Sequence, residues 1–427
     1  MHVVWRVRGP QCARRFRAAI QNVVSRYDLL TSRVVSDDGH LYLERAPEWA
    51  FPERSSGDIS SGFGDGECEQ LHRMIARIVW TPFTAGLLFR PFVIELSAGD
   101  AVCGFVPHHA VMDYYGCQIL AREIRGELTG NAEGTVGDGR ERLQYADYVR
   151  GQVDWLAGSD ARHRLEYWRE CMRDAPNTCL PNAGHVEGTV SLLDCLPFEL
   201  SSTLRIGLVS AARSCRSPMA AVIMAVNHVA LAATLQRDDV VSRVVLSGRD
   251  SPALLSLVGN TVDCFPLRAP VNRQELFPRF AQQLHATFVR GCRHRVRWEA
   301  VKDVMKEVGA GFIAPSFNLI MQAECPAQSA RATGTGSDVS LEPMHVRRPL
   351  ELASASLHKS HHMGLFDTGQ LVHGQIAYMP ARHSKTSVEI FVERFLRYLT
   401  AIAEDPFVSV GRLMDGDWGR ATSVASE

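Results

Sequence analysis

The order of apolar and polar residues predicts strands and helices that alternate along the whole chain. Residues 2–9, HVVWRVRG, alternate between apolar and polar side chains, as a half-buried strand does. The stretch 10–30 that follows places Phe16, Ile20 and Val23 near helical spacing. The second half of the chain repeats these patterns, so both halves are expected to mix strands with helices.

Strands are predicted at 2–9, 31–44 (two strands around an Asp-Asp-Gly turn), 87–96, 101–107, 190–200, 239–248, 261–271, 314–324 and 369–380. Helices are predicted at 10–30, 69–80, 114–128, 142–156, 161–175, 202–215, 217–236, 275–294 and 384–405. This alternation favours a mixed α/β fold, an α+β sandwich built as two lobes. The stretch 176–188, PNTCLPNAGHVEG, has the composition of a linker. We therefore predict lobes at 1–176 and 177–427.

Composition narrows the class of protein. The chain has 427 residues, a hydrophobic fraction of 46% and a net charge of −1. That balance offers no basic surface for nucleic acid or anionic lipid, so neither nucleic acid nor a membrane is expected as a partner. The 11 cysteines form no CxxC pair, which is typical of a reducing compartment. With no secretory signal and no apolar run of about 20 residues, we expect a soluble, cytoplasmic protein.

Two adjacent histidines stand between the strand 101–107 and the helix 114–128. His108 and His109 are followed by Asp113. A neutral imidazole is well matched to proton transfer near pH 7, which acyl transfer to an amine or a hydroxyl requires. If the strand continued through both histidines, their side chains would point in opposite directions, one catalytic and one structural. Asp113 is expected to pair with a buried arginine and fix the loop.

The pattern alone leaves other interpretations open. Asp113 is also well placed as the N-cap of the following helix. His109 and Asp113 have the helical spacing of metal ligands, although no third ligand stands out, and both histidines can be ordinary core residues. A second cluster, HKSHHMG at 358–364, is predicted to lie in a loop and lacks known metal-site spacings. We predict no metal site.

The sequence resembles a known family at this loop. HHAVMDYYG resembles the HHxxxDG signature of condensation domains of nonribosomal peptide synthetases, which belong to the chloramphenicol acetyltransferase-like superfamily. Other stretches resemble family motifs in the same order: RYDLLTSRV (RHExLRTxF), TPFTAGLLFRPFVIEL (PFDLxxGPLLRxxLLxL), YADYVRG (YxDYAxW), DDVVSRVVLSGRD (DDIVVGTPVAGR), VGNTVDCFPLR (IGxFVNTLPLR) and HRVRWEAV (HQDxPFExL). The resemblance extends from about Val3 to Pro406.

The resemblance implies a fold, partners and residue roles. The fold is two acetyltransferase-like lobes in a V-shaped pseudo-dimer with a central tunnel. Substrates arrive on the phosphopantetheine arms of acyl or peptidyl carrier proteins, and no cofactor is permanently bound. His109 positions or deprotonates the acceptor amine, while His108 turns inward and holds the loop. Asp113 pairs with an arginine of the second lobe, and LSGRD supplies Arg249 for that position.

Three departures from the family pattern bear on the site. Tyr114 replaces the glycine that follows the aspartate, and Gly116 compensates in part. In VGNTVDCFPLR, the family has a variable residue, Phe, Asn and Thr at the positions of Asn260, Thr261, Asp263 and Cys264, and this difference indicates an unusual acceptor or neutral drift. We assign Tyr114, Gly116 and Asn260 to the substrate tunnel. The family's opening SxAQxRxWxL segment is missing, and no adenylation or carrier segment accompanies the domain. We therefore expect a free-standing domain or an excised piece of a larger synthetase.

The predicted function is amide-bond formation in natural-product biosynthesis, by attack of an acceptor amine on a carrier-bound acyl thioester. A first alternative is an O- or N-acyltransferase of the same superfamily that uses a soluble amine or alcohol acceptor, or an acyl-CoA. A second is a non-catalytic module that docks carrier proteins. The intact His109 and Asp113 argue against the second alternative, because such a module has no chemical need for them.

Overall fold

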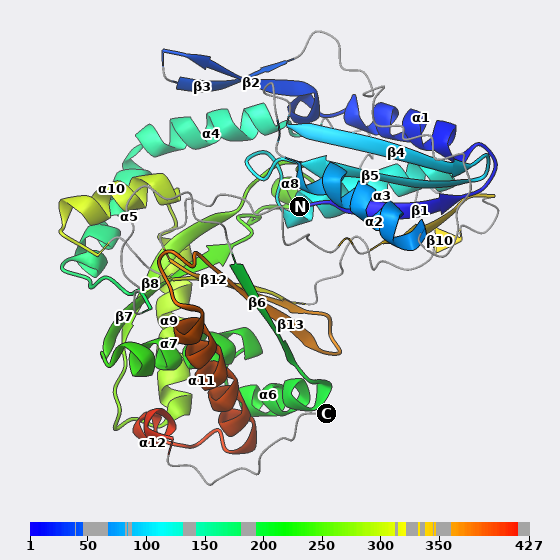
Figure 1. The fold of residues 1–427 in the computed structure, drawn as a ribbon. Helices are drawn as coiled ribbons and strands as arrows, with labels where there is room; N and C mark the ends of the chain where they lie inside the picture. The colour runs from blue at the N-terminus through cyan, green and yellow to red at the C-terminus, as the bar shows by residue number, and fades with distance from the viewer. Residues whose placement is uncertain are drawn as a thin grey trace. The chain divides into compact units, whose positions relative to one another are not determined.

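A computed structural model describes most of the chain, and Figure 1 shows its ribbon. The described residues are 1–38, 40–45, 67–81, 83, 88–130, 142–180, 194–311, 315–321, 332–333, 338–344, 346 and 360–416. The chain divides into two compact units, each built from three separate segments. Unit 1 comprises Met1–Trp155, Ser247–Val262 and Glu324–Leu352, and unit 2 comprises Leu156–Leu246, Asp263–Ala323 and Ala353–Glu427.

These units group the chain differently from the predicted lobes. The predicted division into 1–176 and 177–427 is contiguous, whereas Ser247–Val262 belongs to unit 1 although both flanking strands belong to unit 2. The division into lobes at 1–176 and 177–427 therefore remains a prediction. Of the predicted linker 176–188, residues 181–188 lie outside the described residues.

Unit 1 is built on a five-stranded sheet in the order β10-β11-β1-β5-β4. Every neighbouring pair in it is antiparallel. The strands are β1 (Val3–Arg8), β4 (Phe89–Ser97), β5 (Asp100–Pro107), β10 (Ala332–Thr333) and β11 (Ser340–Pro343). The alternation at the start of the chain places β1 between β5 and β11, with Trp5 opposite Cys103 on one side and Pro343 on the other.

Helices cover both faces of this sheet (Figure 1). They are α1 (Cys12–Val24), α2 (Glu67–Trp80) and α3 (Tyr114–Thr129). Val3, Trp5 and Val7 of β1 pack into one core cluster with residues of α1 and α3. Val4 packs on the opposite face with residues of α2. The alternation of β1 therefore divides its side chains between two apolar layers.

The other described elements of unit 1 are short ones and one longer helix. They are the 3₁₀ turn η1 (Asp28–Thr31), the hairpin β2 (Ser32–Asp37) and β3 (His40–Arg45), α8 (Pro252–Leu255), and α4 (Tyr145–Ala157), which begins in unit 1. The hairpin lies where the Asp-Asp-Gly turn was predicted.

Unit 2 is built on a six-stranded mixed sheet in the order β6-β13-β12-β9-β7-β8. The strands are β6 (Asp194–Leu200), β7 (Asp239–Leu246), β8 (Asp263–Pro270), β9 (Ser316–Ile320), β12 (His362–Asp367) and β13 (Val372–Tyr378). β9 is parallel to both β7 and β12, and the other pairs are antiparallel. Along β13, Val372, Ile376 and Tyr378 are buried while His373 and Gln375 are exposed.

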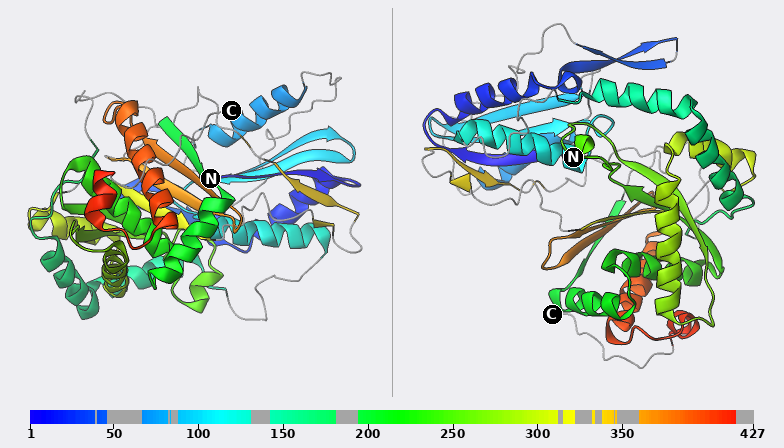
Figure 2. Two further views of the ribbon diagram at one scale, coloured as in Figure 1. Left: turned by 90° about the horizontal axis from the view of Figure 1, so that it is seen from below. Right: turned by 180° about the vertical axis from the view of Figure 1, so that it is seen from behind.

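Helices pack on one face of this sheet, as the views in Figure 2 show. They are α6 (Ser202–Ser214), α7 (Met219–Leu235), α9 (Phe277–Arg293) and α11 (Lys385–Glu404), with α12 (Val410–Asp415) against α7. The remaining helices, α5 (Ser159–Met172) and α10 (Trp298–Glu307), pack against each other.

Among the described residues, no single helix is both long enough and apolar enough to cross a membrane. Only the bent pair α6 and α7, with an angle of 97° between them, passes a test of length and apolar composition when the two are taken together.

Most predicted elements are confirmed, with one clear error. HKSHHMG was predicted to be a loop, but His362 begins β12. His361 just before it is buried, and the strand lies between β13 and β9 in the sheet. Residues 358–359 lie outside the described residues. Helix α10 was not predicted.

Candidate functional site

The site begins where β5 ends, at Pro107. His108 and His109 follow the strand in a turn, in which the Val111 N–H donates to the His108 carbonyl. The His108 N–H donates to the Leu88 carbonyl at 2.8 Å and holds this turn to the start of β4. Because the strand does not continue through the two histidines, its alternation does not govern them, and both are exposed.

His109 has one ring nitrogen held by the backbone. Its Nδ1 lies 3.2 Å from the Met112 carbonyl oxygen. A carbonyl oxygen only accepts hydrogen bonds, so Nδ1 must carry the proton in this contact. In the neutral ring, Nε2 then has a free lone pair. The loop therefore presents an exposed imidazole whose Nε2 can accept a proton.

His108 is not placed as the resemblance implied. It was expected to turn inward, but its side chain is exposed and lies edge-on to Phe83, with 5.4 Å between ring centroids. It does contribute to the loop, because its Nδ1 accepts a hydrogen bond from the Ala110 N–H at 3.1 Å. Partial desolvation, and then the charge of His109, lower the pKa of His108 and favour the neutral ring.

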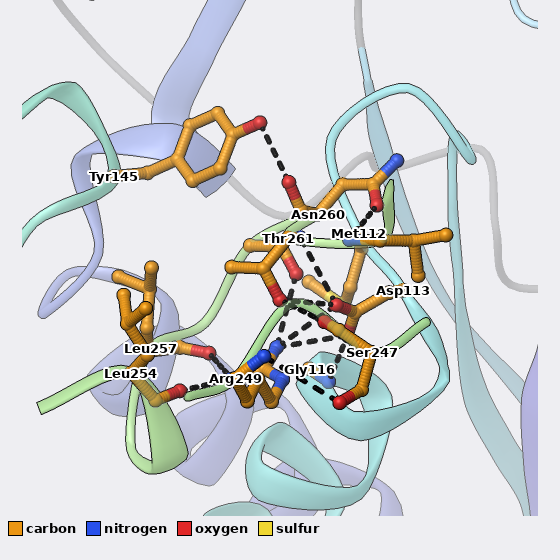
Figure 3. Close-up of polar contacts among 12 residues, drawn as sticks. Met112, Asp113, Gly116, Tyr145, Ser247, Arg249, Leu254, Leu257, Asn260 and Thr261 are labelled. Carbon is orange, nitrogen blue, oxygen red and sulfur yellow. Dashed lines mark hydrogen bonds and ion pairs between the residues drawn. The ribbon is translucent and has the colours of Figure 1, made fainter. Parts of the chain in front are cut away.

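Asp113 both caps a helix and forms an ion pair (Figure 3). It is the N-cap of α3, and its Oδ1 accepts from the Gly116 N–H at 2.6 Å. The same carboxylate is 2.8 Å from Nη2 of Arg249. The two side chains are 0% and 3% exposed. The N-cap role and the ion pair, which the sequence offered as alternatives, are present together.

Arg249 is surrounded by acceptors from its own segment. Its Nη1 donates to the carbonyls of Leu254 and Leu257, and its Nη2 also contacts the Gly259 carbonyl at 3.3 Å. The resemblance placed this arginine in the second lobe. The contacts instead group its segment Ser247–Val262 with unit 1, so the ion pair with Asp113 lies within one compact unit.

Two neighbouring residues complete the polar cluster and were not assigned these contacts from the sequence. The N–H and Oγ1 of Thr261 each lie 3.0 Å from Oδ2 of Asp113. The Nδ2 of Asn260 donates to the His109 carbonyl at 2.8 Å. The only sequence signal was at Thr261, which departs from the family motif, since that motif is variable at the position of Asn260. The assignment of Asn260 to a tunnel remains a prediction.

Gly116 lies in the packed interior, contrary to its assignment to a substrate tunnel. It is buried, and a Cβ added there would lie 2.9 Å from the Gly259 carbonyl oxygen. The missing side chain therefore lets α3 approach the segment that carries Arg249. Tyr114 is half-buried, and its ring packs edge-on to Tyr115 at 5.7 Å. Its role toward substrate remains a prediction.

Within the described part of the chain, no three side chains of the metal-ligating types gather in a way that would hold an ion. The side chains of the site offer chemistry of their own. An exposed imidazole, with its tautomer set by a backbone carbonyl, stands on a loop anchored by a buried ion pair. This arrangement can accept a proton from an attacking nucleophile, or hold that nucleophile in line.

Comparison with known proteins places this geometry in context. A 27% identical relative over 96% of this chain is the probable non-canonical nonribosomal peptide synthetase CymA of Salinispora arenicola. This chain spans 5% of that protein's length.

The fold is shared with solved structures. SgcC5 of Streptomyces globisporus, solved with (R)-(-)-1-(2-naphthyl)-1,2-ethanediol and sucrose, has a TM-score of 0.78 at 16% identity, over 96% of this chain and 93% of its own. The X-domain from teicoplanin biosynthesis has a TM-score of 0.76 at 17% identity, over 96% and 91%. That X-domain has also been solved in complex with OxyB. The predicted chloramphenicol acetyltransferase-like, mixed α/β fold class is confirmed.

The family itself is shown by a sequence match that covers nearly the whole chain. The family model described as "Condensation domain" matches residues 1–414, a range that contains the histidine loop and the segment that holds it. This chain belongs to the condensation-domain family.

Proposed function

We propose that this chain forms an amide bond between an acceptor amine and an acyl group carried as a thioester. The amine nitrogen attacks the thioester carbonyl carbon, the C–S bond breaks, and the thiol leaves on its carrier. Membership of the condensation-domain family supports this reaction class. The observation that carries the proposal is the exposed His109 imidazole, whose Nδ1 is held by the Met112 carbonyl.

His109 has a defined task in this reaction. Attack makes the amine nitrogen cationic, so a proton must leave it as the C–N bond forms. The Nε2 of His109 can accept that proton and pass it to the departing thiolate, which balances the step. An α-amine has a pKa of about 8 and is mostly protonated at neutral pH. His109 therefore either takes this proton first and releases it before the attack, or holds an amine that arrives neutral.

The partners follow from the same proposal. The acyl donor is a carrier protein whose phosphopantetheine arm bears the thioester, and the acceptor is a second carrier-bound amine or a free one. The arm is part of the substrate, so the reaction needs no resident cofactor. Asp113 and Arg249 hold the loop and take no part in the chemistry, because both are buried and bonded to each other and to backbone groups.

The test uses carrier proteins loaded with a panel of acyl groups, incubated with this chain and with aminoacyl carriers or free amino acids. Mass spectrometry then detects the amide on the acceptor. His109→Ala should lower the turnover by about 10²–10⁴-fold while carrier binding is unchanged. The matched control is His163→Ala, the same replacement at an exposed histidine of α5, which should retain full turnover.

Other outcomes would overturn the proposal in distinct ways. Transfer to an alcohol, or from acyl-CoA with no carrier, would identify an O- or N-acyltransferase. Carrier binding without acyl transfer under any condition would identify a non-catalytic docking module. In such a module His109 would have no chemical role. Full turnover by His109→Ala would remove the imidazole from the mechanism.

A further inference from the structure

We propose that Asn260 is a positioning residue for His109, and that Tyr145 fixes Asn260 in turn. This inference rests on the proposed function, because it gives the orientation of His109 a catalytic purpose. The sequence suggested a different role for Asn260, as part of a substrate tunnel. The contacts connect its side chain to the backbone of the histidine loop.

The amide of Asn260 has a single orientation that satisfies both of its neighbours. Its Nδ2 donates to the His109 carbonyl at 2.8 Å, and its Oδ1 accepts from the Val262 N–H at 3.1 Å. A flipped amide would put oxygen against a carbonyl and NH₂ against an N–H. The side chain is therefore locked between two backbone groups and fixes the position of the His109 carbonyl.

The segment Gly259–Thr261 holds both ends of the histidine loop. Asn260 holds the His109 end, as described. At the other end, the Asp113 N–H donates to the Gly259 carbonyl at 3.3 Å, and Thr261 donates to the Asp113 carboxylate. The intervening Met112 carbonyl is the group that sets the tautomer of His109. Loss of Asn260 would thus free the end of the loop that carries the imidazole.

Tyr145, the first residue of α4, supports Asn260 from the far side. Its hydroxyl donates to the Asn260 carbonyl at 3.0 Å (Figure 3). Its ring lies directly over Gly259, since a Cβ added at Gly259 would be 2.3 Å from the ring carbon Cδ2. The hydrogen bonds thus run in series from Tyr145 to Asn260 and on to His109.

The expected consequence is a change in turnover with little change in substrate binding. Positioning effects act on the reaction geometry, and a misplacement of about 1 Å can cost about 100-fold in rate. We expect Asn260→Ala to lower kcat by about 10- to 100-fold, with KM within about threefold of wild type. Tyr145→Phe removes only the hydroxyl, so its loss in kcat should be smaller. If the hydrogen bonds act in series, the double variant should lose no more than Asn260→Ala alone.

The matched control is Gln144→Ala. Gln144 also bridges two backbone groups through its amide: it donates to the Arg26 carbonyl at 3.2 Å and accepts from the Asp28 N–H at 3.2 Å. It precedes Tyr145 in the chain, and among the described residues its amide contacts Arg26 and Asp28 and not the histidine loop. A merely structural role for Asn260 predicts that both alanine variants lower the melting temperature alike and leave kcat unchanged.

A spectroscopic readout separates this inference from the proposed reaction. In protein with ¹⁵N-labelled histidine, the His109 signals, assigned by their loss in His109→Ala, should report Nδ1–H in the wild type. In Asn260→Ala the ring should shift toward the Nε2–H tautomer. An unchanged tautomer, or a kcat equal to that of Gln144→Ala, would overturn the inference. Full turnover by His109→Ala would instead overturn the proposed function and leave the tautomer result standing. If Asn260→Ala does not fold, Tyr145→Phe supplies both measurements.

Discussion

Replacement of Arg249 by methionine removes the guanidinium from the interior but keeps an unbranched side chain of similar reach. The Asp113 carboxylate, 0% exposed, would then be buried without its cation. The N–H groups of Gly116 and Thr261 would remain to it as donors, while the single proton of the Thr261 hydroxyl is shared with the Ser247 carbonyl at 2.7 Å. The carbonyls of Leu254 and Leu257 would also lose the guanidinium as a donor, although that of Leu254 keeps the Leu257 N–H at 3.3 Å.

The cost follows from this burial. Removal of one partner of a buried ion pair typically costs about 3–5 kcal/mol, because the other charge remains uncompensated. A protein of this kind has about 5–15 kcal/mol of unfolding free energy, so the variant should lose a large share of it. In Arg249→Met/Asp113→Asn no buried charge remains, and asparagine still serves as an N-cap. The double variant should therefore be more stable than Arg249→Met alone.

Urea denaturation followed by circular dichroism and tryptophan fluorescence measures this, with midpoint and slope both fitted. The control is Arg33→Met, which breaks the exposed pair of Arg33 with Glu44 (49% and 52% exposed) and should cost about 0–1 kcal/mol. If Arg249→Met lowered the free energy of unfolding by less than about 1 kcal/mol, the reasoning would be refuted, since so small a loss is typical of a solvent-exposed ion pair. A double variant less stable than Arg249→Met would refute it as well.

Two further predictions concern acid stability and close packing. Burial lowers the pKa of His228 to about 4 and that of His361 to about 3, so the unfolded chain binds protons below pH 6.5 that the folded chain does not. The free energy of unfolding should be at its full value above pH 6.5 and should fall below that pH by up to about 1.4 kcal/mol per pH unit for each histidine. Melting temperatures at pH 7.5 and 5.0 measure this fall. An equally steep fall in His228→Gln would contradict the prediction. A Cβ in Gly259→Ala would lie 2.3 Å from the Tyr145 ring and should cost about 1–3 kcal/mol in denaturation. At Gly151 in α4, an added Cβ would meet no atom of another element within 4 Å, so Gly151→Ala should raise the free energy of unfolding by about 0.5–1 kcal/mol. If Gly259→Ala were the more stable of the two variants, the packing described for Gly259 would be contradicted.

Local patterns predicted the elements well because local physics forms them. The alternation of residues 2–9 became β1, and the helical spacing of Phe16, Ile20 and Val23 became the buried face of α1. The polarity pattern gave a wrong prediction at β12, where the adjacent histidines His361 and His362 indicated a polar loop. The structure buries His361 and pairs the following strand on both sides, so tertiary pairing outweighed local polarity.

The site was predictable in its parts and not in its assembly. The partnership of Asp113 with Arg249 came from a family resemblance, since no local signal joins residues so far apart in the chain. The alternation argument did not apply to His108 and His109 because β5 ends at Pro107. The contacts of Asn260 and Thr261 depend on the fold of a segment distant in sequence. Their only trace in the sequence was Thr261, a polar residue where the family motif has Phe.

The path of the chain through Ser247–Val262 limits how this protein can be dissected. The segment leaves β7 and re-enters β8, both in unit 2, yet packs in unit 1. A fragment that stopped at residue 176 would carry Asp113 but no counter-ion for it, and would lack the backbone that fastens His109. No single cut releases unit 1 intact, so exchange of this half between relatives requires three pieces of chain to be transplanted together.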